Sequence, residues 1–178
     1  MQEQEAALAR TLTLRAFPTY CVLPCSALAL DGLGAFPASC DWLTVLVYLF
    51  LLEFCVFLDH YYMLHKWKHF RHDVHHFFKK RIDAWASFAF YPFDGLSQGL
   101  PALYVALLVP VTARVVYTTI AVIGAWTIFI HTNTGIRVPF LLGYEYHAVH
   151  HAKGWYNFGL FTKTFDVLFK TLREPDDD

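Results

Sequence analysis

The strongest constraint on the fold is the run at 42–58, WLTVLVYLFLLEFCVFL, which is interrupted only by Thr44 and Glu53. A helix needs about 20 mostly apolar residues, within a range of about 17–25, to cross the hydrocarbon core of a bilayer. The run therefore predicts a membrane-spanning helix. Composition agrees, because 56% of the 178 residues are apolar and only 16% are charged, whereas soluble domains are about a quarter charged. These values make a free soluble domain a poor interpretation and exclude a disordered chain.

Three further apolar runs extend the prediction. Those at 97–113 and 115–130 are joined at Arg114 and predict a helical hairpin. The run at 17–30 is short and carries Pro18 and Pro24, so we expect a bent or re-entrant span there. The sequence thus predicts an all-α polytopic membrane protein. It would form a single domain over residues 1–178, with about four transmembrane or re-entrant helices.

The basic residues indicate how these spans are oriented. Six of the fourteen Lys and Arg residues fall within 66–81, and clusters of this kind mark the cytosolic side of a membrane. Tracing the spans from this segment puts all ten histidines on that side, at or just beyond helix ends. We therefore expect a histidine-rich helical cap facing the cytosol, with histidine clusters at 60–76 and 131–151. The formal net charge of −1 gives no reason to expect nucleic acid as a partner.

The histidines follow a repeated pattern, HxxHH, which occurs at 72–76 and again at 147–151. Residues i, i+3 and i+4 share one face of a helix, so we expect each segment to aim three imidazoles at one point. Neutral imidazole binds iron, zinc and copper. With three further histidines, the segments provide nine candidate ligands, which suit two metal ions sharing a site. These candidates are His60, His65, His72, His75, His76, His131, His147, His150 and His151.

The first histidine cluster allows two assignments. Helical spacing favours a stripe of His65, His69, His72 and His76, which makes His69 a possible ligand. His60 and His65 lie about 140° apart on an ideal α-helix. Using both would need a kink, a π-bulge or ligation of different metals. The spacing alone leaves these alternatives open.

Four other polar residues are candidates for the site. Asp94, within Pro-x-Asp-Gly, is expected to be a turn or cap residue rather than a proton donor. Asn157 is a candidate for a hydrogen bond to a ligating imidazole. Glu53 lies within a span and is a functional candidate, or a structural one that reaches the interface. Asp59 either orients the imidazole of His60 or marks the end of the span.

Several motifs together carry a family resemblance. Residues 89–101, AFYPFDGLSQGLP, look like an AFHPxDGxxQxxP block, and residues 125–131, AWTIFIH, look like a WTxxIH stretch. The segment from His147 to Pro175 carries HAVHH, a Tyr-Asn-x-Gly element and a closing Arg-x-Pro. The chain resembles the fatty acid hydroxylase and sterol desaturase superfamily, most nearly the sterol C-5 desaturases (lathosterol oxidases). In that family an E-x6-H spacing leads into the first histidine box, and Glu53 precedes His60 at the same spacing. The resemblance therefore favours His60-x4-His65 as the first histidine box.

This resemblance implies two iron ions held by histidines, O2 as co-substrate, and electrons from NAD(P)H through cytochrome b5. It implies a sterol substrate and an endoplasmic reticulum membrane. The basic stretch at 66–81 would then dock the acidic donor, or would only orient the spans.

The chain also departs from the family pattern. The first box has four residues between its histidines instead of three, and Tyr61 and Tyr91 replace an Arg and a His of the family. An N-terminal membrane hairpin is also expected to be missing. Two alternatives therefore stay open: a lipid hydroxylase acting on a fatty acyl, sterol-methyl or carotenoid substrate, and an inactive truncated relative. A metal transporter is disfavoured, because transporters place ligands near the bilayer midplane.

Overall fold

The structure is a computed structural model that describes residues 2–79 and 82–175. Within these residues the chain is helical, and its only β-type pairing is an isolated antiparallel bridge between Leu141 and Thr162. The predicted all-α class is therefore confirmed. The elements are α1 (Gln2–Gly32), α2 (Trp42–Leu58), the π-helix η1 (Asp59–Lys66), the 3-10 helices η2 (His69–Phe77) and η3 (Ala86–Phe88), α3 (Pro92–Gly99), α4 (Pro101–Leu108), α5 (Ala113–Ile130), α6 (Tyr144–Lys153) and α7 (Thr164–Phe169).

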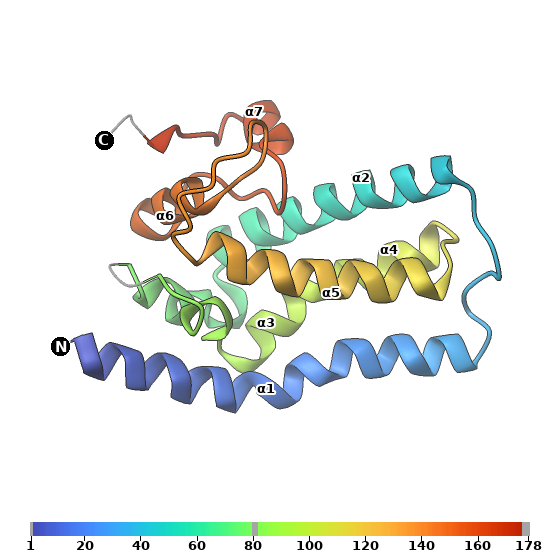
Figure 1. Cartoon of the computed structure of the whole chain (residues 1–178), viewed down its shortest axis with the longest axis horizontal. Helices are drawn as coiled ribbons and strands as arrows, with labels where there is room; N and C mark the ends of the chain where they lie inside the picture. The colour runs from blue at the N-terminus through green and yellow to red at the C-terminus, as the bar shows by residue number, and fades with distance from the viewer. Residues whose placement is uncertain (1, 80–81, 176–178) are drawn as a thin grey trace.

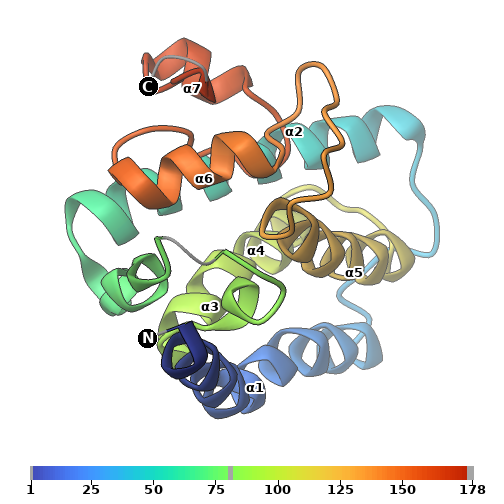
Figure 2. The same ribbon diagram turned by 60° about the vertical axis from the view of Figure 1, so that its left-hand side comes forward.

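The long helices α1, α2 and α5 run side by side, with α3 and α4 between them (Figure 1). Their shared core includes Tyr48, Leu52, Val105 and Val116, and the Tyr48 hydroxyl donates to the carbonyl of Ala102 at 3.0 Å. Both ends of the described chain lie at the same end of this bundle as α6 and α7. Figure 2 turns that end toward the viewer. The histidine-bearing elements η1, η2 and α6 gather there.

Two helices have the length and hydropathy of membrane spans. The continuous helix Trp42–Lys66, made of α2 and η1, has 25 residues, and α5 has 18. Apolar side chains on their surfaces stay exposed, including Leu46 at 62% and Phe50 at 58%. An exposed apolar surface of this kind is stable only against lipid or a partner. The structure thus indicates an integral membrane protein.

Two of the four expected spans differ from the sequence prediction. The run at 17–30 belongs to α1, a 31-residue helix that contains Pro18 and Pro24 and bends in its middle (Figure 1). The expected bend is therefore present, but the helix is longer than the short element that the run predicted. The amphipathic N-terminal residues continue the helix, because Ala9 packs on Phe78 and Ala86. The run at 97–113 is divided at Pro101 and stops at Leu108. Among the described helices, only α2–η1 and α5 are long and apolar enough to span a bilayer, so the predicted four-span count is not confirmed.

Helices α1 and α3 approach closely, and this contact positions the site. A Cβ atom added at Gly95 would lie 2.6 Å from Tyr20 Cε1, and one at Gly99 would lie 2.8 Å from Leu23 Cδ2. Small residues four apart on a helix let two backbones pack tightly. The packing holds the first turn of α3, which carries Asp94, against the histidine-bearing end.

Candidate metal centre

The first two histidines lie on one turn of π-helix. The α2 helix continues into η1, where the Trp67 amide donates to the Tyr62 carbonyl at 2.8 Å, an i to i+5 hydrogen bond. This wider turn brings the rings of His60 and His65 to a centroid distance of 5.1 Å. Of the alternatives left open by the spacing, the structure therefore shows the π-bulge.

The stripe that included His69 is absent. Lys68, Phe70 and Arg71 adopt left-handed backbone angles, with φ between 54° and 63°, so no regular helix joins η1 to η2. His69 is exposed and belongs to neither of the two groups that the other histidines form. The i, i+4 spacing from His65 to His69 therefore does not place the two side chains on one helix face, because the chain turns between them.

The other nine histidines form two compact groups. In each group, the potential ligand nitrogens all lie within 4.8 Å of one another. Group one consists of His60, His65, His72, His76 and His150, and group two of His75, His131, His147 and His151.

Each HxxHH segment is divided between the groups, so the expectation that three imidazoles of one segment meet at one point is wrong. The first and last histidines of a segment stay together, and the middle one crosses to the other group: His75 joins group two and His150 joins group one. In α6 the helix period explains this, because positions i+3 and i+4 are about 100° apart at 3.6 residues per turn. Because the two segments face each other, the middle histidine of each one joins the group that holds the other two histidines of the opposite segment.

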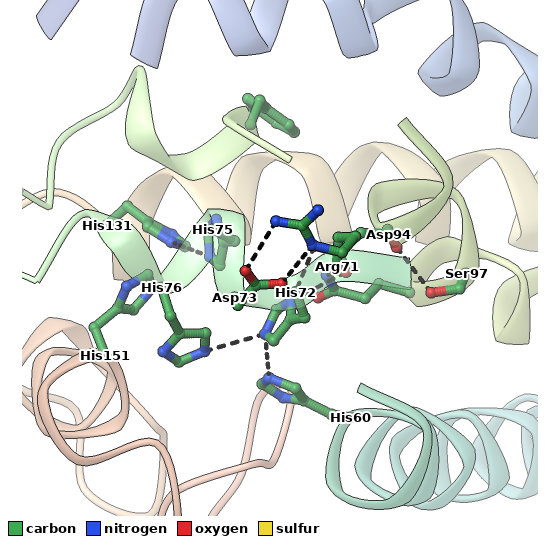
Figure 3. Close-up of polar contacts among 12 residues, drawn as sticks. His60, Arg71, His72, Asp73, His75, His76, Asp94, Ser97, His131 and His151 are labelled. Atoms are coloured by element: carbon green, nitrogen blue, oxygen red, sulfur yellow. Dashed lines mark hydrogen bonds and ion pairs between the residues drawn. The ribbon is translucent and has the colours of Figure 1, made fainter. Parts of the chain in front are cut away.

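In group one, the Nε2 atoms of two neutral imidazoles, His60 and His72, face each other without a proton to share. His60 Nδ1 donates to the Phe158 carbonyl at 3.1 Å, and His72 Nδ1 donates to Asp94 at 2.9 Å. A neutral imidazole has one N–H, so each Nε2 carries a lone pair. These two Nε2 atoms nevertheless lie 3.2 Å apart, and His76 Nε2 lies 3.1 Å from His72 Nε2 (Figure 3). Lone pairs at this distance call for a cation between them.

Group two has the same arrangement. His131 Nδ1 donates to the Thr127 carbonyl at 2.7 Å, which leaves Nε2 as an acceptor 3.2 Å from His75 Nε2 and 3.0 Å from His147 Nε2. Burial lowers the pKa of His131 to about 4 and holds the pKa values of His75, His147 and His151 well below their usual range. These rings are therefore neutral near pH 7, the state in which imidazole binds metals.

Both groups fit metal ions. Two nitrogens that each lie about 2.1 Å from one ion at a right angle are about 3.0 Å apart, close to the observed separations. In group one, two further ring nitrogens, His65 Nε2 and His150 Nε2, are also buried without a hydrogen-bond partner among the described residues. Such atoms are costly unless something binds them. Imidazole-rich sites of this kind suit iron, zinc, copper or nickel.

Asp94 is more than the turn residue that its motif suggested. It lies in the first turn of α3, with its amide bonded to the Tyr91 carbonyl. Its fully buried carboxylate accepts from His72 Nδ1 (Figure 3) and also from Gln98 Nε2. A carboxylate behind an imidazole fixes which nitrogen faces the metal and raises its basicity. Asp94 therefore orients His72.

Asn157 does not hydrogen-bond to an imidazole, contrary to expectation. Its side chain bonds to the carbonyls of Tyr146 and Arg173 and to the Arg173 amide, at 2.9–3.0 Å, and its backbone is left-handed with φ at 59°. The carbonyls on either side of it hold the site: Tyr156 O accepts from His150 Nδ1 at 2.7 Å, and Phe158 O accepts from His60 Nδ1. Asn157 thus fixes the turn that presents both carbonyls to group one.

Two buried carboxylates tie the C-terminal segment in place. Glu53 accepts from the amides of Phe161 and Thr162, so its role within the span is structural. Asp166, which the sequence did not single out as a site residue, accepts from the amides of Phe158 and Gly159. Asp59 makes no hydrogen bond to an imidazole in the described part of the chain, and its Oδ2 has no hydrogen-bond partner there.

Sequence reasoning missed the contacts made by backbone carbonyls, because any residue type supplies a carbonyl. It also missed Phe90, whose ring stacks on His75 with a centroid distance of 4.1 Å. The motif around position 89 pointed to the segment but not to this contact.

Comparison with known proteins agrees with the resemblance seen in the motifs. The fatty acid hydroxylase family profile matches residues 45–171. A Delta(7)-sterol-C5(6)-desaturase of Nicotiana tabacum is 30% identical over 93% of this chain and 66% of its own length. The Delta(7)-sterol 5(6)-desaturase of Candida dubliniensis is 35% identical over 70% of this chain and 34% of its own. Human lathosterol oxidase is 30% identical over 82% of this chain and 50% of its own.

The chain spans about one third to two thirds of the length of these curated relatives. No solved structure matches it significantly. The matched profile covers most of the chain, including every histidine of both groups. This chain therefore belongs to the fatty acid hydroxylase family.

Proposed function

We propose that the protein is a membrane-bound, O2-dependent lipid oxidase that holds two iron ions, one in each histidine group, and that it desaturates a sterol at C-5. The observation that carries this proposal is the pair of adjacent histidine groups, in each of which the potential ligand nitrogens lie within 4.8 Å of one another. The names of the relatives support the sterol substrate. Iron bound there would supply the activation of O2 needed to remove hydrogen from an unactivated C–H bond.

The chain's own residues prepare this chemistry by fixing the imidazoles. Asp94 and three backbone carbonyls each accept a hydrogen bond from the Nδ1–H of one ring, so the opposite nitrogen is free to bind metal. Phe158 lies against the rings of His60, His65 and His150 and keeps water from that side of group one. A dry, preorganised set of ligands lowers the cost of reorganisation during the reaction.

The proposed electron donor is cytochrome b5, docked where group one reaches the surface. A cavity of about 520 Å³ opens on His65, His72 and His76, and lysines at positions 68, 79 and 153 line it. Lys80 and Arg81, which belong to the basic stretch at 66–81, lie outside the described residues. An acidic protein would be attracted to this rim, and the attraction would weaken as salt is raised. We place this rim on the cytosolic side of the endoplasmic reticulum membrane.

The test is sterol analysis in yeast that lacks its own Delta(7)-sterol 5(6)-desaturase. Expression of the chain should restore the C-5 double bond, and His150→Ala should not. The purified wild-type protein should contain about two irons, and His150→Ala fewer. A new hydroxyl group in place of the double bond would support the lipid hydroxylase. Iron-free protein without product, made with ample iron, would support the inactive relative.

A further inference from the structure

We propose that part of the histidine-bearing end is embedded in lipid, through an exposed apolar surface named here the C-terminal patch. The patch consists of Ile136, Val138, Phe140, Val167 and Leu168, from the loop between α5 and α6 and from α7. Its partner is the leaflet on the histidine side of the membrane. The inference depends on the spans α2 and α5 and not on the proposed function.

Helix α7 packs on the second half of the spanning helix α2. The ring centroid of Phe165 lies 5.5 Å from that of Phe50, and the ring centroid of Phe169 lies 4.9 Å from that of Phe57. Phe50 and Phe57 both belong to the apolar run at 42–58. Helix α7 therefore lies alongside the span, at the depth of these residues, and not beyond its end (Figure 1).

Hydrogen bonds attach the segment before α7 to both spanning helices. Glu53 on α2 accepts from the amides of Phe161 and Thr162, and the indole N–H of Trp126 on α5 donates to the Leu160 carbonyl at 2.7 Å. These bonds satisfy polar groups that would be costly to leave unpaired in apolar surroundings. The segment is thus held between the two spans, and α7 is fixed at its depth.

The loop between α5 and α6 is joined to the same segment. The Lys163 amide donates to the Phe140 carbonyl at 3.1 Å, and the Leu142 amide donates to the Phe161 carbonyl at 2.8 Å. Phe140 therefore lies beside the start of α7. Its backbone is left-handed, with φ at 69°, which is unfavourable for a bulky residue, and its ring is nevertheless turned outward and exposed.

The surroundings at this depth decide what the C-terminal patch contacts. Phe165 is buried against α2, whereas Val167 and Leu168 on the same helix are exposed. An exposed apolar surface next to a membrane span, and continuous with its lipid-facing residues, is stable against lipid. Arg137 and Lys170 border the patch and are exposed. Basic side chains at the edge of an apolar surface reach the headgroups, as is typical of elements that lie in a membrane interface.

Phe77 provides a matched comparison for Phe140. It is 57% exposed and precedes Lys79 within the basic stretch at 66–81, after the end of the span. Because Phe140 is 82% exposed, it should react faster than Phe77 with a reagent dissolved in water if both rings face water. Lipid over the C-terminal patch reverses this order, since it keeps the reagent from Phe140.

The test uses the wild-type chain in phosphatidylcholine nanodiscs. Hydroxyl radicals are generated in the water, and mass spectrometry of peptides measures the oxidation rate of each ring. We expect Phe140 to be oxidised at least fivefold more slowly than Phe77. Oxidation of Phe140 as fast as that of Phe77, or faster, would place the C-terminal patch in water and overturn the inference.

Photochemical cross-linking identifies what covers the patch. The photoreactive amino acid p-benzoylphenylalanine replaces Leu168 in one variant and Trp155 in another. Trp155 is the control, because it is also exposed but lines the cavity that carries the lysines. Illumination in the same nanodiscs should add the mass of a phospholipid to the first variant and not to the second. A cross-link between two chains at position 168, without a lipid adduct, would assign the patch to a contact between copies and overturn the inference. Thermal unfolding checks that each variant folds, and the wild-type oxidation rates decide the question if one does not.

Discussion

The two HxxHH segments have the same sequence pattern in different backbones. His147, His150 and His151 lie on the regular helix α6, whereas His72, His75 and His76 lie on the 3-10 helix η2, just after its two left-handed residues Phe70 and Arg71. A 3-10 helix repeats every three residues and would put His72 and His75 on one side. The structure instead pairs His72 with His76 and sends His75 to His131.

The difference shows which forces place a ligand in each segment. In α6 the helical period alone separates His150 from its neighbours. In η2 the separation needs partners from elsewhere in the chain, because Asp94 fixes His72 and Phe90 stacks on His75. The first segment should therefore depend more on its surroundings than the second.

The largest effect should come from removing the histidines that cross between groups. We expect His75→Ala to remove the metal of group two and His150→Ala that of group one, each lowering activity by more than about 100-fold, since even outer partners of ligands contribute 10–100-fold. Iron content with Mössbauer spectroscopy of each variant would identify the site that is lost. Loss of the same iron in both variants would contradict the assignment of His75 to group two and of His150 to group one.

The dependence of η2 on its partner can be tested at Asp94. In Asp94→Ala the ring of His72 loses its fixed orientation, so the metal affinity of group one should fall by about 10–100-fold. Metal competition with a chelator measures this. Asp73→Ala is the matched control, because this neighbouring carboxylate pairs with Arg71 at the surface. An equal loss at both groups would indicate general unfolding instead.

A smaller effect is expected at Asn157. This residue fixes the turn whose Tyr156 carbonyl accepts a hydrogen bond from His150 on α6. Asn157→Ala should destabilise the protein, because a left-handed backbone costs an alanine about 1–2 kcal/mol and each lost hydrogen bond about 0.5–1.5 kcal/mol. Group one should then bind metal about tenfold more weakly. Asn157→Gly retains the backbone angle and should lose less in both thermal unfolding and metal affinity. Equal losses for Ala and Gly would show that the backbone angle plays no part.

The smallest effect should be that of His69→Ala. His69 is exposed and lies outside both groups, and surface substitutions usually change stability by less than about 0.5 kcal/mol. Iron content and activity should match those of wild type within twofold. Loss of a metal ion in this variant would instead support His69 as a ligand, as the helical stripe suggested by the spacing would have it.

Much of this molecule could be predicted from local sequence. The apolar run at 42–58 became α2 with the same bounds, and the run at 115–130 lies within α5. The helix α1 could not be bounded in this way, because its N-terminal half is held by packing on Phe78 and Ala86 and not by apolar composition. The break at Pro101 was visible in the sequence, but its consequence for the length of the span was missed.

The sequence by itself determined the inventory of the site: which histidines gather, their number, and the family to which their spacing belongs. Only the tertiary structure decided which histidine joins which group, that His60 and His65 share a π turn, and that Asp94 stands behind His72. The physical reason is that spacing fixes the angle between neighbouring side chains on one element. The ion that a ring faces depends on how separate elements are turned toward each other, and packing between distant residues sets that orientation.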